Sequence, residues 1–219
     1  PRRRLGAIKR ATIDDSPKPA CLFNSTVQYK LERDKDGNPS RYKARWCCDG
    51  RTAKYQRPSF HFSPTASLTS HKLLDAFACH VGNVSWQCDV SSAYLLADQP
   101  DDTLYMRFPE QLAMHDELGR PMYLHVTRSL YGLPTSAANW YNCISTWAEE
   151  AGFRISDGDP CLWVLTQGDQ RLALSIHVDD IQATGPPALL IERFLKPCLA
   201  KFPLRFAGPT ARPRGRATN

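Results

Sequence analysis

Leu174-Ser175-Ile176-His177-Val178-Asp179-Asp180-Ile181-Gln182-Ala183-Thr184-Gly185 decides the fold, because two adjacent carboxylates interrupt a run of strand-forming residues. A buried carboxylate is costly unless a partner compensates for its lost hydration. Neighbouring strand residues point to opposite faces, so Asp179 and Asp180 reach one site only from a tight turn. Hard oxygen ligands at such a turn suit Mg²⁺. The stretch therefore predicts a β-hairpin that holds a cation at its tip, with a solvated surface turn as the alternative.

A second acid lies in similar surroundings. Val84–Val90 alternates apolar and polar residues with period two, which predicts a half-buried strand ending at Asp89. A carboxylate at a strand end together with an acidic hairpin tip is typical of a two-metal site, in which the cations lie about 3.5–4 Å apart. We therefore expect Asp89, Asp179 and Asp180 to converge.

Composition limits the class of protein. The chain has 219 residues, 42% of them hydrophobic, and five Trp, which indicates a globular middle. No apolar run approaches the ~20 residues of a membrane span, so no membrane partner is expected. Eight Cys without a C-x-x-C pair predict reduced, apolar thiols rather than a zinc site. The first residue is Pro rather than Met, and we expect a piece of a longer protein.

A net charge of +6 and a pI near 9.0 favour a polyanionic partner. The basic residues of Lys30–Arg57 interleave with Tyr29, Tyr42, Trp46 and Tyr55. Cations alternating with aromatic rings are typical of a groove that neutralises phosphates and stacks bases. The basic residues near both termini are interpreted as disordered tails.

Periodicity and turn signals predict the remaining elements. Two strands are expected on either side of the turn at residues 34–39. A helix is expected over 68–81, with Leu73, Leu74 and Phe77 facing inward, and a second helix is expected over 135–153. A hairpin is expected around Gly168-Asp169, and a last helix over 188–202 that Pro197 shortens or kinks. Hairpins around a few helices predict an α+β fold with an antiparallel sheet and helices on one face.

Eight short motifs occur in order between about Thr26 and Gly185. They are Arg41-Tyr42-Lys43-Ala44-Arg45, Phe62-Ser63-Pro64, Leu68-Thr69-Ser70, Asp89-Val90 with Ala93-Tyr94, Leu104-Tyr105-Met106, Ser129-Leu130-Tyr131-Gly132-Leu133 with Trp140-Tyr141, Asp159-Pro160-Cys161-Leu162, and Val178-Asp179-Asp180 with Thr184-Gly185. Together they resemble the reverse transcriptase region of copia-type retrotransposon polyproteins.

The resemblance implies an RNA-directed DNA polymerase domain that performs two-metal nucleotidyl transfer with two Mg²⁺ ions, or Mn²⁺ in their place. It implies a disordered basic lead-in over 1–24, a fingers subdomain over 25–67, a palm over 68–205, a basic tail over 206–219, and a thumb that is truncated or absent. Partners would be an RNA or DNA primer–template and deoxynucleoside triphosphates; the oligomeric state stays open. An intracellular location is expected, in a virus-like particle or the nucleus, within a polyprotein that also serves DNA integration.

The resemblance also assigns roles to residues. Asp89, Asp179 and Asp180 would be the catalytic metal ligands. Lys30, Arg45, Val90 and Tyr94 would bind the nucleotide, with Tyr94 under the sugar. Lys43 and His177 would contact nucleic acid.

Several residues depart from the family pattern. Thr135 stands where a Gln beside the incoming nucleotide is expected, and His177 replaces a Tyr. The alternative is therefore a catalytically inactive, truncated remnant that at most binds nucleic acid. A two-metal nuclease shares the carboxylates but would need neither Tyr94 nor the basic cluster.

Overall fold

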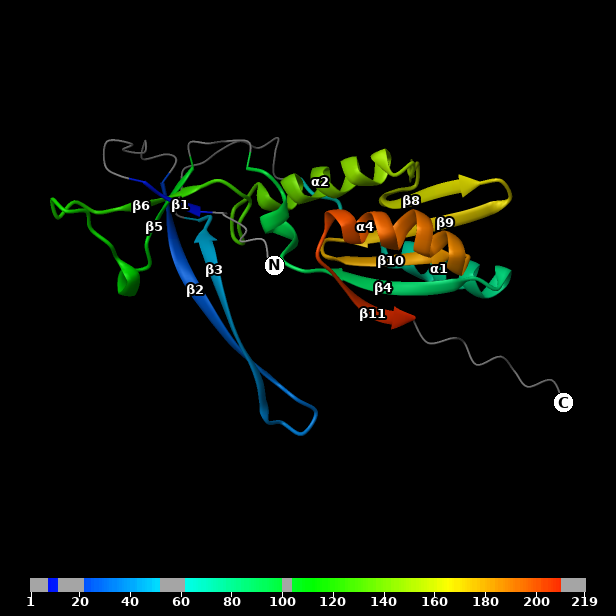
Figure 1. Cartoon of the computed structure of the whole chain (residues 1–219), viewed down its shortest axis with the longest axis horizontal. Coiled ribbons are helices and arrows are strands. Elements are labelled where there is room, and N and C mark those ends of the chain that lie inside the picture. Colours follow the sequence, from blue (N-terminus) through cyan, green and yellow to red (C-terminus); the bar gives the residue numbers. More distant parts are fainter. Residues whose placement is uncertain (1–7, 12–21, 52–61, 100–103, 210–219) are drawn as a thin grey trace. The chain divides into compact units, whose positions relative to one another are not determined.

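The computed structural model describes residues 8–11, 22–51, 62–99 and 104–209 of the chain. It is a mixed α/β structure with two sheets and few helices (Figure 1). The chain divides into two compact units, one made of residues 1–62 and 94–140 and the other of residues 63–93 and 141–219. The boundary differs from the expected one at residue 67, because residues 94–140 group with the N-terminal hairpin.

The first unit contains a five-stranded sheet in the order β1-β6-β5-β2-β3. Its strands are β1 (Ile8–Ala11), β2 (Leu22–Arg33), β3 (Pro39–Asp49), β5 (Tyr105–Arg107) and β6 (Tyr123–Val126). All neighbours are antiparallel except β2 and β5. Part of the lead-in expected to be disordered is thus ordered, because β1 pairs with β6 and β2 begins at Leu22; residues 1–7 and 12–21 lie outside the described residues.

β2 and β3 form the long hairpin that the turn signal predicts (Figure 1). Asp34 organises the turn, because its Oδ1 accepts the backbone N–H groups of Asp36 at 3.0 Å and Asn38 at 2.9 Å. Gly37 has a φ of +84°, which suits a residue without Cβ. The local chemistry of this short segment therefore sets the register of the whole hairpin.

The core of the first unit lies at the base of the hairpin. Its members are buried apolar side chains from β2, β3, β5, β6 and the segment after β6: Phe23, Cys48, Leu104, Met106, Leu124, Val126, Leu130 and Leu133. Burial raises the pKa of Cys48 to about 12, so this thiol is protonated and behaves as a small apolar group.

The second unit contains a fully antiparallel six-stranded sheet in the order β11-β4-β10-β9-β8-β7. Its strands are β4 (Val84–Val90), β7 (Arg154–Ser156), β8 (Asp159–Gln167), β9 (Gln170–His177), β10 (Asp180–Gly185) and β11 (Leu204–Pro209). β11 includes the start of the region expected to be a basic tail; residues 210–219 lie outside the described residues.

Helix α1 (Leu68–Val81) has the predicted bounds. Its N-cap Ser67 accepts the N–H of Ser70 at 3.0 Å, and Gly82 ends it in the left-handed conformation. The buried line differs from the expected one: it consists of Ser70, Leu74 and Ala78, whereas Leu73 is 60% exposed. The helix thus presents a small, partly polar face to the sheet.

The other helices are α2 (Ser136–Glu150), which a positive-φ Gly152 follows, and a continuous helical segment made of α3 (Pro187–Leu189), a π-helical stretch (Leu190–Leu195) and α4 (Lys196–Lys201). Pro197 does not break this segment. Lys196 donates its N–H to the Ile191 carbonyl, five residues back, so the widened turn accommodates the proline that follows.

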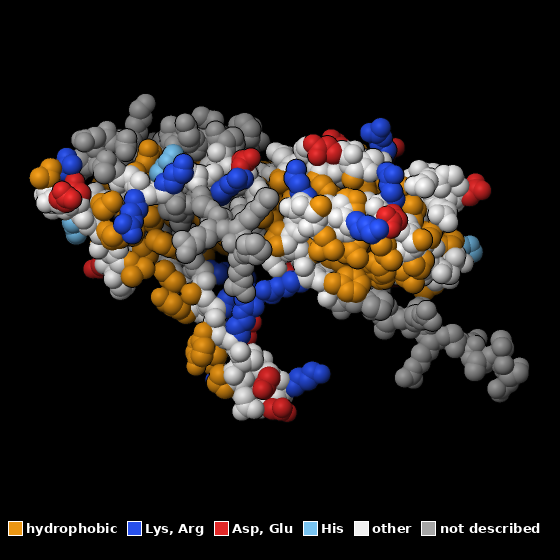
Figure 2. All heavy atoms as spheres, in the orientation of Figure 1, with side chains coloured by type: hydrophobic (Ala, Val, Ile, Leu, Met, Phe, Trp, Pro, Cys, Tyr) orange, Lys and Arg blue, Asp and Glu red, His pale blue; other side chains and the backbone are white. Residues whose placement is uncertain are grey.

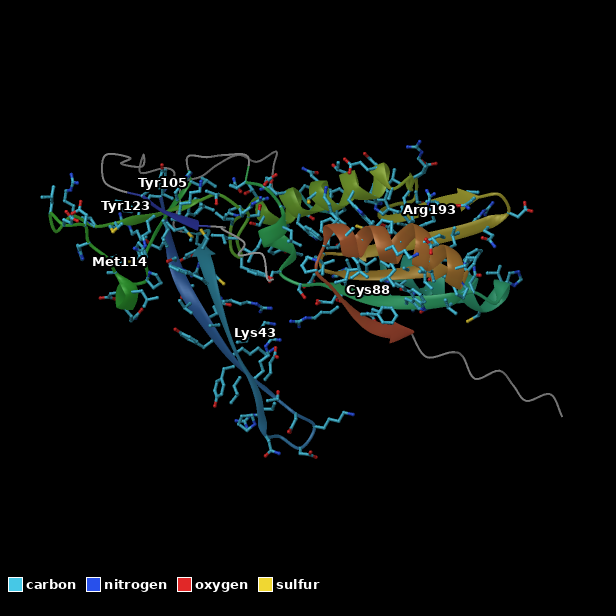
Figure 3. All side chains as sticks on the ribbon, viewed as in Figure 1. Lys43, Cys88, Tyr105, Met114, Tyr123 and Arg193 are labelled. Atoms are coloured by element: carbon cyan, nitrogen blue, oxygen red, sulfur yellow. The ribbon has the colours of Figure 1, made fainter. Side chains whose placement is uncertain are left out.

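Helices cover both faces of the six-stranded sheet, so the expected packing on one face is wrong. α1 forms hydrogen bonds to Gln182, which also bonds to Ser85 on the same face of the sheet. Cys88 and Ile181 are an odd number of residues away from Ser85 and Gln182 along these strands, so they lie on the opposite face. Cys88, labelled on β4 in Figure 3, interacts with Cys198 of α4. The face towards α4 is apolar, and the face towards α1 is polar.

Within the described residues, the helices are too short or too polar to cross a lipid bilayer.

Candidate active site

The predicted acids lie in the second unit, at one end of the six-stranded sheet. Asp89 ends β4 and Asp180 begins β10, and the two are direct cross-strand partners. Arg205 of β11 is opposite Asp89, and His177 of β9 is opposite Asp180. A row of cation, acid, acid and imidazole therefore crosses four strands on one face, since cross-strand partners share a face.

Asp179 occupies the two-residue turn between β9 and β10, together with Val178. Its carbonyl accepts the N–H of Val90 at 2.7 Å, which ties the turn to the end of β4. Val178 has a φ of +55°, a conformation that a β-branched residue rarely adopts. Such strain persists only where the surroundings impose it, and it is concentrated at functional sites.

The charges of these acids interact. Partial burial, then the neighbouring Asp179 and Asp89 carboxylates, raise the pKa of Asp180, while His177 and His71 lower it. Repulsion between carboxylates is what a divalent cation relieves, and carboxylate oxygens are the donors that Mg²⁺ prefers. The donor chemistry therefore fits Mg²⁺, although among the described residues no three His, Cys, Asp or Glu side chains are arranged around one cation position.

The first unit brings together two of the predicted nucleotide-binding residues, Arg45 and Tyr94, around Tyr131. The Tyr94 ring lies 5.1 Å from the Tyr131 ring, and the Arg45 guanidinium lies 5.3 Å from the centre of the same ring. The Cys48 N–H donates to the Tyr131 carbonyl at 2.7 Å, which fixes this turn on β3. From the sequence, Tyr131 was recognised only as part of a motif. The structure shows that its ring contacts both Tyr94 and Arg45.

A pocket of about 660 Å³ opens beside this cluster. It is lined by residues of β2, β3 and the turn after β6: Thr26, Gln28, Arg45, Cys47, Cys48, Asp49, Gly50, Arg51, Tyr131 and Gly132. Arg51 is paired with Asp49 through Nε at 3.0 Å, whereas Arg45 stacks on the aromatic ring. The pocket thus combines an aromatic face, the Gln28 amide and two guanidinium groups.

The hairpin has two different faces. Lys30 and Lys43 are direct partners, and Gln28 pairs with Arg45, so these polar side chains share one face. Tyr29 and Tyr42 point the other way and are 80% and 82% exposed. Figure 2 shows hydrophobic side chains along one side of the hairpin and basic ones along the other, and Figure 3 labels Lys43 there. The expected interleaving of cations and rings in a single groove is therefore wrong for this hairpin, and Tyr55, the last ring of the expected cluster, lies outside the described residues.

Two further positions matter. Thr135, at the place of the expected Gln, is buried and directs its hydroxyl to Gln99 Oε1 at 3.4 Å, so it offers no side chain to a ligand in solvent. Asp159 of the Asp-Pro-Cys motif caps α1: its carboxylate accepts the N–H of Ser67 at 3.1 Å and the hydroxyl of Ser70. The sequence analysis gave Asp159 no role, yet a lone acid just ahead of the hairpin expected around Gly168-Asp169 was a signal.

Known proteins resemble this chain in sequence over most of its length. Residues 11–214 match the family described as Reverse transcriptase (RNA-dependent DNA polymerase). The chain is 31% identical over 178 residues, 78% of its length, to the retrovirus-related Pol polyprotein from transposon RE2 of Arabidopsis thaliana. It is 27% identical over 184 residues, 83% of its length, to that from transposon TNT 1-94 of Nicotiana tabacum. It is 31% identical over 168 residues, 74% of its length, to the Ty1-DR4 Gag-Pol polyprotein of Saccharomyces cerevisiae. The aligned region spans 12%, 14% and 9% of these relatives.

Proposed function

Because this chain belongs to the reverse transcriptase family of copia-type retrotransposon Pol polyproteins, we propose that it extends a primer with deoxynucleotides on an RNA template. The observation that carries the proposal is the strained turn that sets Asp179 and Asp180 beside Asp89. The six-stranded sheet would serve as the palm, and the β2–β3 hairpin would belong to the fingers.

We assign Asp89, Asp179 and Asp180 as the ligands of two Mg²⁺ ions. When bound, these ions would lower the pKa of the primer hydroxyl and neutralise the triphosphate. The protein's part would be to hold Asp89 and Asp180 as cross-strand partners, with Asp179 in the adjoining turn and Val90 and His177 beside them. The cross-strand pairing of Asp89 with Asp180 supports this assignment.

The pocket of the first unit is the proposed nucleotide-binding surface. Arg45 has its guanidinium beside the Tyr131 ring and suits a phosphate oxygen, whereas Tyr94 is assigned to the sugar. Lys30 is exposed and would add a second cation. Lys43 lies 3.5 Å from Glu32, so its charge is partly offset, and we assign it to the template rather than to the nucleotide.

The test is primer extension with a DNA primer, an RNA template and deoxynucleoside triphosphates, in Mg²⁺ or Mn²⁺. We expect Asp179→Asn to abolish extension, because it removes a ligand while keeping the size of the side chain. The matched control is Asp169→Asn, the same change in the turn at the other end of β9, which should extend as the parent does.

Extension that survives Asp179→Asn would overturn the proposed site. A parent chain that binds Mn²⁺ at these acids but extends no primer would overturn the proposed activity and identify the chain as an inactive remnant.

A further inference from the structure

A buried polar network lies between α1 and the sheet, on the face that carries Asp89 and Asp180. Its centre is Gln182, two residues after Asp180 on β10 and therefore on the same face. Gln182 is 8% exposed. The opposite face of β10, with Ile181 and Ala183, is apolar and fully buried. The polar network is therefore confined to the face that carries the acids.

The amide of Gln182 joins three elements. Its Oε1 accepts a hydrogen bond from His71 Nδ1 of α1 at 2.8 Å. Its Nε2 donates to Asp75 Oδ1 of α1 at 2.7 Å and to Ser85 Oγ of β4 at 3.0 Å. Since an amide oxygen only accepts, His71 donates through Nδ1, which fixes the orientation of its ring.

This network sets the register beside the acids. Gln182 is opposite Gln87 in the same antiparallel ladder that places Asp180 opposite Asp89. A slip of one residue would turn Asp180 to the apolar face and would also break all three amide bonds. Satisfied buried networks specify one arrangement, because any alternative leaves polar atoms unpaired.

We infer that Gln182 is a positioning residue for the acid pair: it locks α1 and β4 against β10 so that the Asp179–Asp180 turn and Asp89 stay in register. The inference rests on the proposed function for its link to metal binding. The hydrogen bonds themselves are independent of that function. Thr184 supplies a matched control, because its Oγ1 donates to Ser85 Oγ at 3.0 Å at the far end of the same network.

The test compares Gln182→Met, which keeps an unbranched side chain of similar length without hydrogen bonds, with Thr184→Val. The first readout is amide hydrogen exchange at Val90, whose N–H bonds to Asp179 in the turn. We expect faster exchange at Val90 in Gln182→Met and no change there in Thr184→Val, with both variants folded by circular dichroism.

The second readout is Mn²⁺ affinity by titration calorimetry. We expect Gln182→Met to weaken it roughly tenfold, as loss of outer-shell support does, and Thr184→Val to leave it within about twofold. The double change Gln182→Glu with Asp75→Asn exchanges donor and acceptor between the two side chains. Gln182→Glu alone should lose Mn²⁺ affinity, because it places a second carboxylate against Asp75. The double change should recover that affinity.

Unchanged Val90 exchange in Gln182→Met, or equal acceleration in Thr184→Val, would overturn the inference. If Val90 exchange responds as expected but the parent chain binds no Mn²⁺, the positioning role stands and the proposed metal site fails.

Discussion

At Gly132, one hydrogen atom in place of a side chain allows two segments of the first unit to meet. Its φ is +86°, and a Cβ built there would lie 1.8 Å from the carbonyl oxygen of Cys48. We expect Gly132→Ala to lower the free energy of unfolding by about 3 kcal/mol or more, because the added methyl must displace backbone. Urea unfolding measures this loss of stability. The matched control is Gly119→Ala: Gly119 also has a positive φ, +74°, but a Cβ built there meets nothing within 4 Å, so the change should cost only about 1 kcal/mol. Equal losses would contradict the close approach as the cause.

Asp180 links charge to stability. Partial burial and then the Asp179 and Asp89 carboxylates raise its pKa above the ordinary 3.8. A carboxyl whose pKa is higher in the folded state stabilises the fold below its unfolded pKa and loses that contribution as pH rises through the folded value. Asp180→Asn should therefore raise Tm at pH 7 by about 2 °C, and the gain should shrink as the pH falls to 4. Thermal melts across this range test it, with Asp169→Asn as control; a lower Tm at pH 7 would contradict the repulsion.

Among the elements, α1 depends on a carboxylate far away in the sequence. Burial alone would raise the pKa of Asp159, but hydrogen bonds from Ser70, Cys161 and Ser67 outweigh it, and the net pKa is lowered. Its contribution is therefore present above pH 3.8 and lost as pH falls through the lower folded value, the opposite sign to Asp180. Asp159→Ala should cost about 1–3 kcal/mol at pH 7 by leaving buried donors unpaired. Denaturant unfolding at pH 7 and in acid measures this loss of stability, with Asp157→Ala at an exposed position as the control. A loss of the same size in acid would contradict the role of the ionised carboxylate.

The sequence could predict the elements whose signals are local. α1, the hairpin β2–β3 and the hairpin β8–β9 form where period and turn residues place them, and Asp179-Asp180 lies at the predicted turn. The faces were harder to predict. Leu73 continues an apolar stripe in the sequence, yet the sheet beneath α1 is polar and selects Ser70 instead. Tyr29 and Tyr42 alternate with Lys30 and Lys43, so period two alone could have separated rings from cations.

Pairing between distant segments is what a single sequence does not determine. Asp159 with Ser70, and Gln182 with His71, become partners only once the six-stranded sheet is assembled. A polar residue inside an apolar strand was the available signal for Gln182. Its three partners could not be found without the register of β4 against β10.

For the whole molecule, the net charge of +6 predicts binding to nucleic acid that weakens with salt. Each phosphate contact releases condensed counterions, so log K falls linearly with log salt, by about 0.7 per contact on single strands and about 0.9 on duplex. If the polar face of the hairpin provides the contacts, replacing Lys30, Lys43 and Arg45 with Gln should flatten the slope by about 2.

The matched control replaces three exposed cations of the other unit, Lys72, Arg171 and Lys201, and so removes the same charge. Fluorescence anisotropy with a primer–template, measured across salt concentrations, separates local contact from total charge. Equal flattening in both variants would mean that net charge alone attracts the polyanion. An unchanged slope in the hairpin variant would place the phosphate contacts outside the hairpin. Flattening confined to the hairpin variant would assign the phosphate contacts to its cationic face, because only counterions displaced at the contact surface enter the slope.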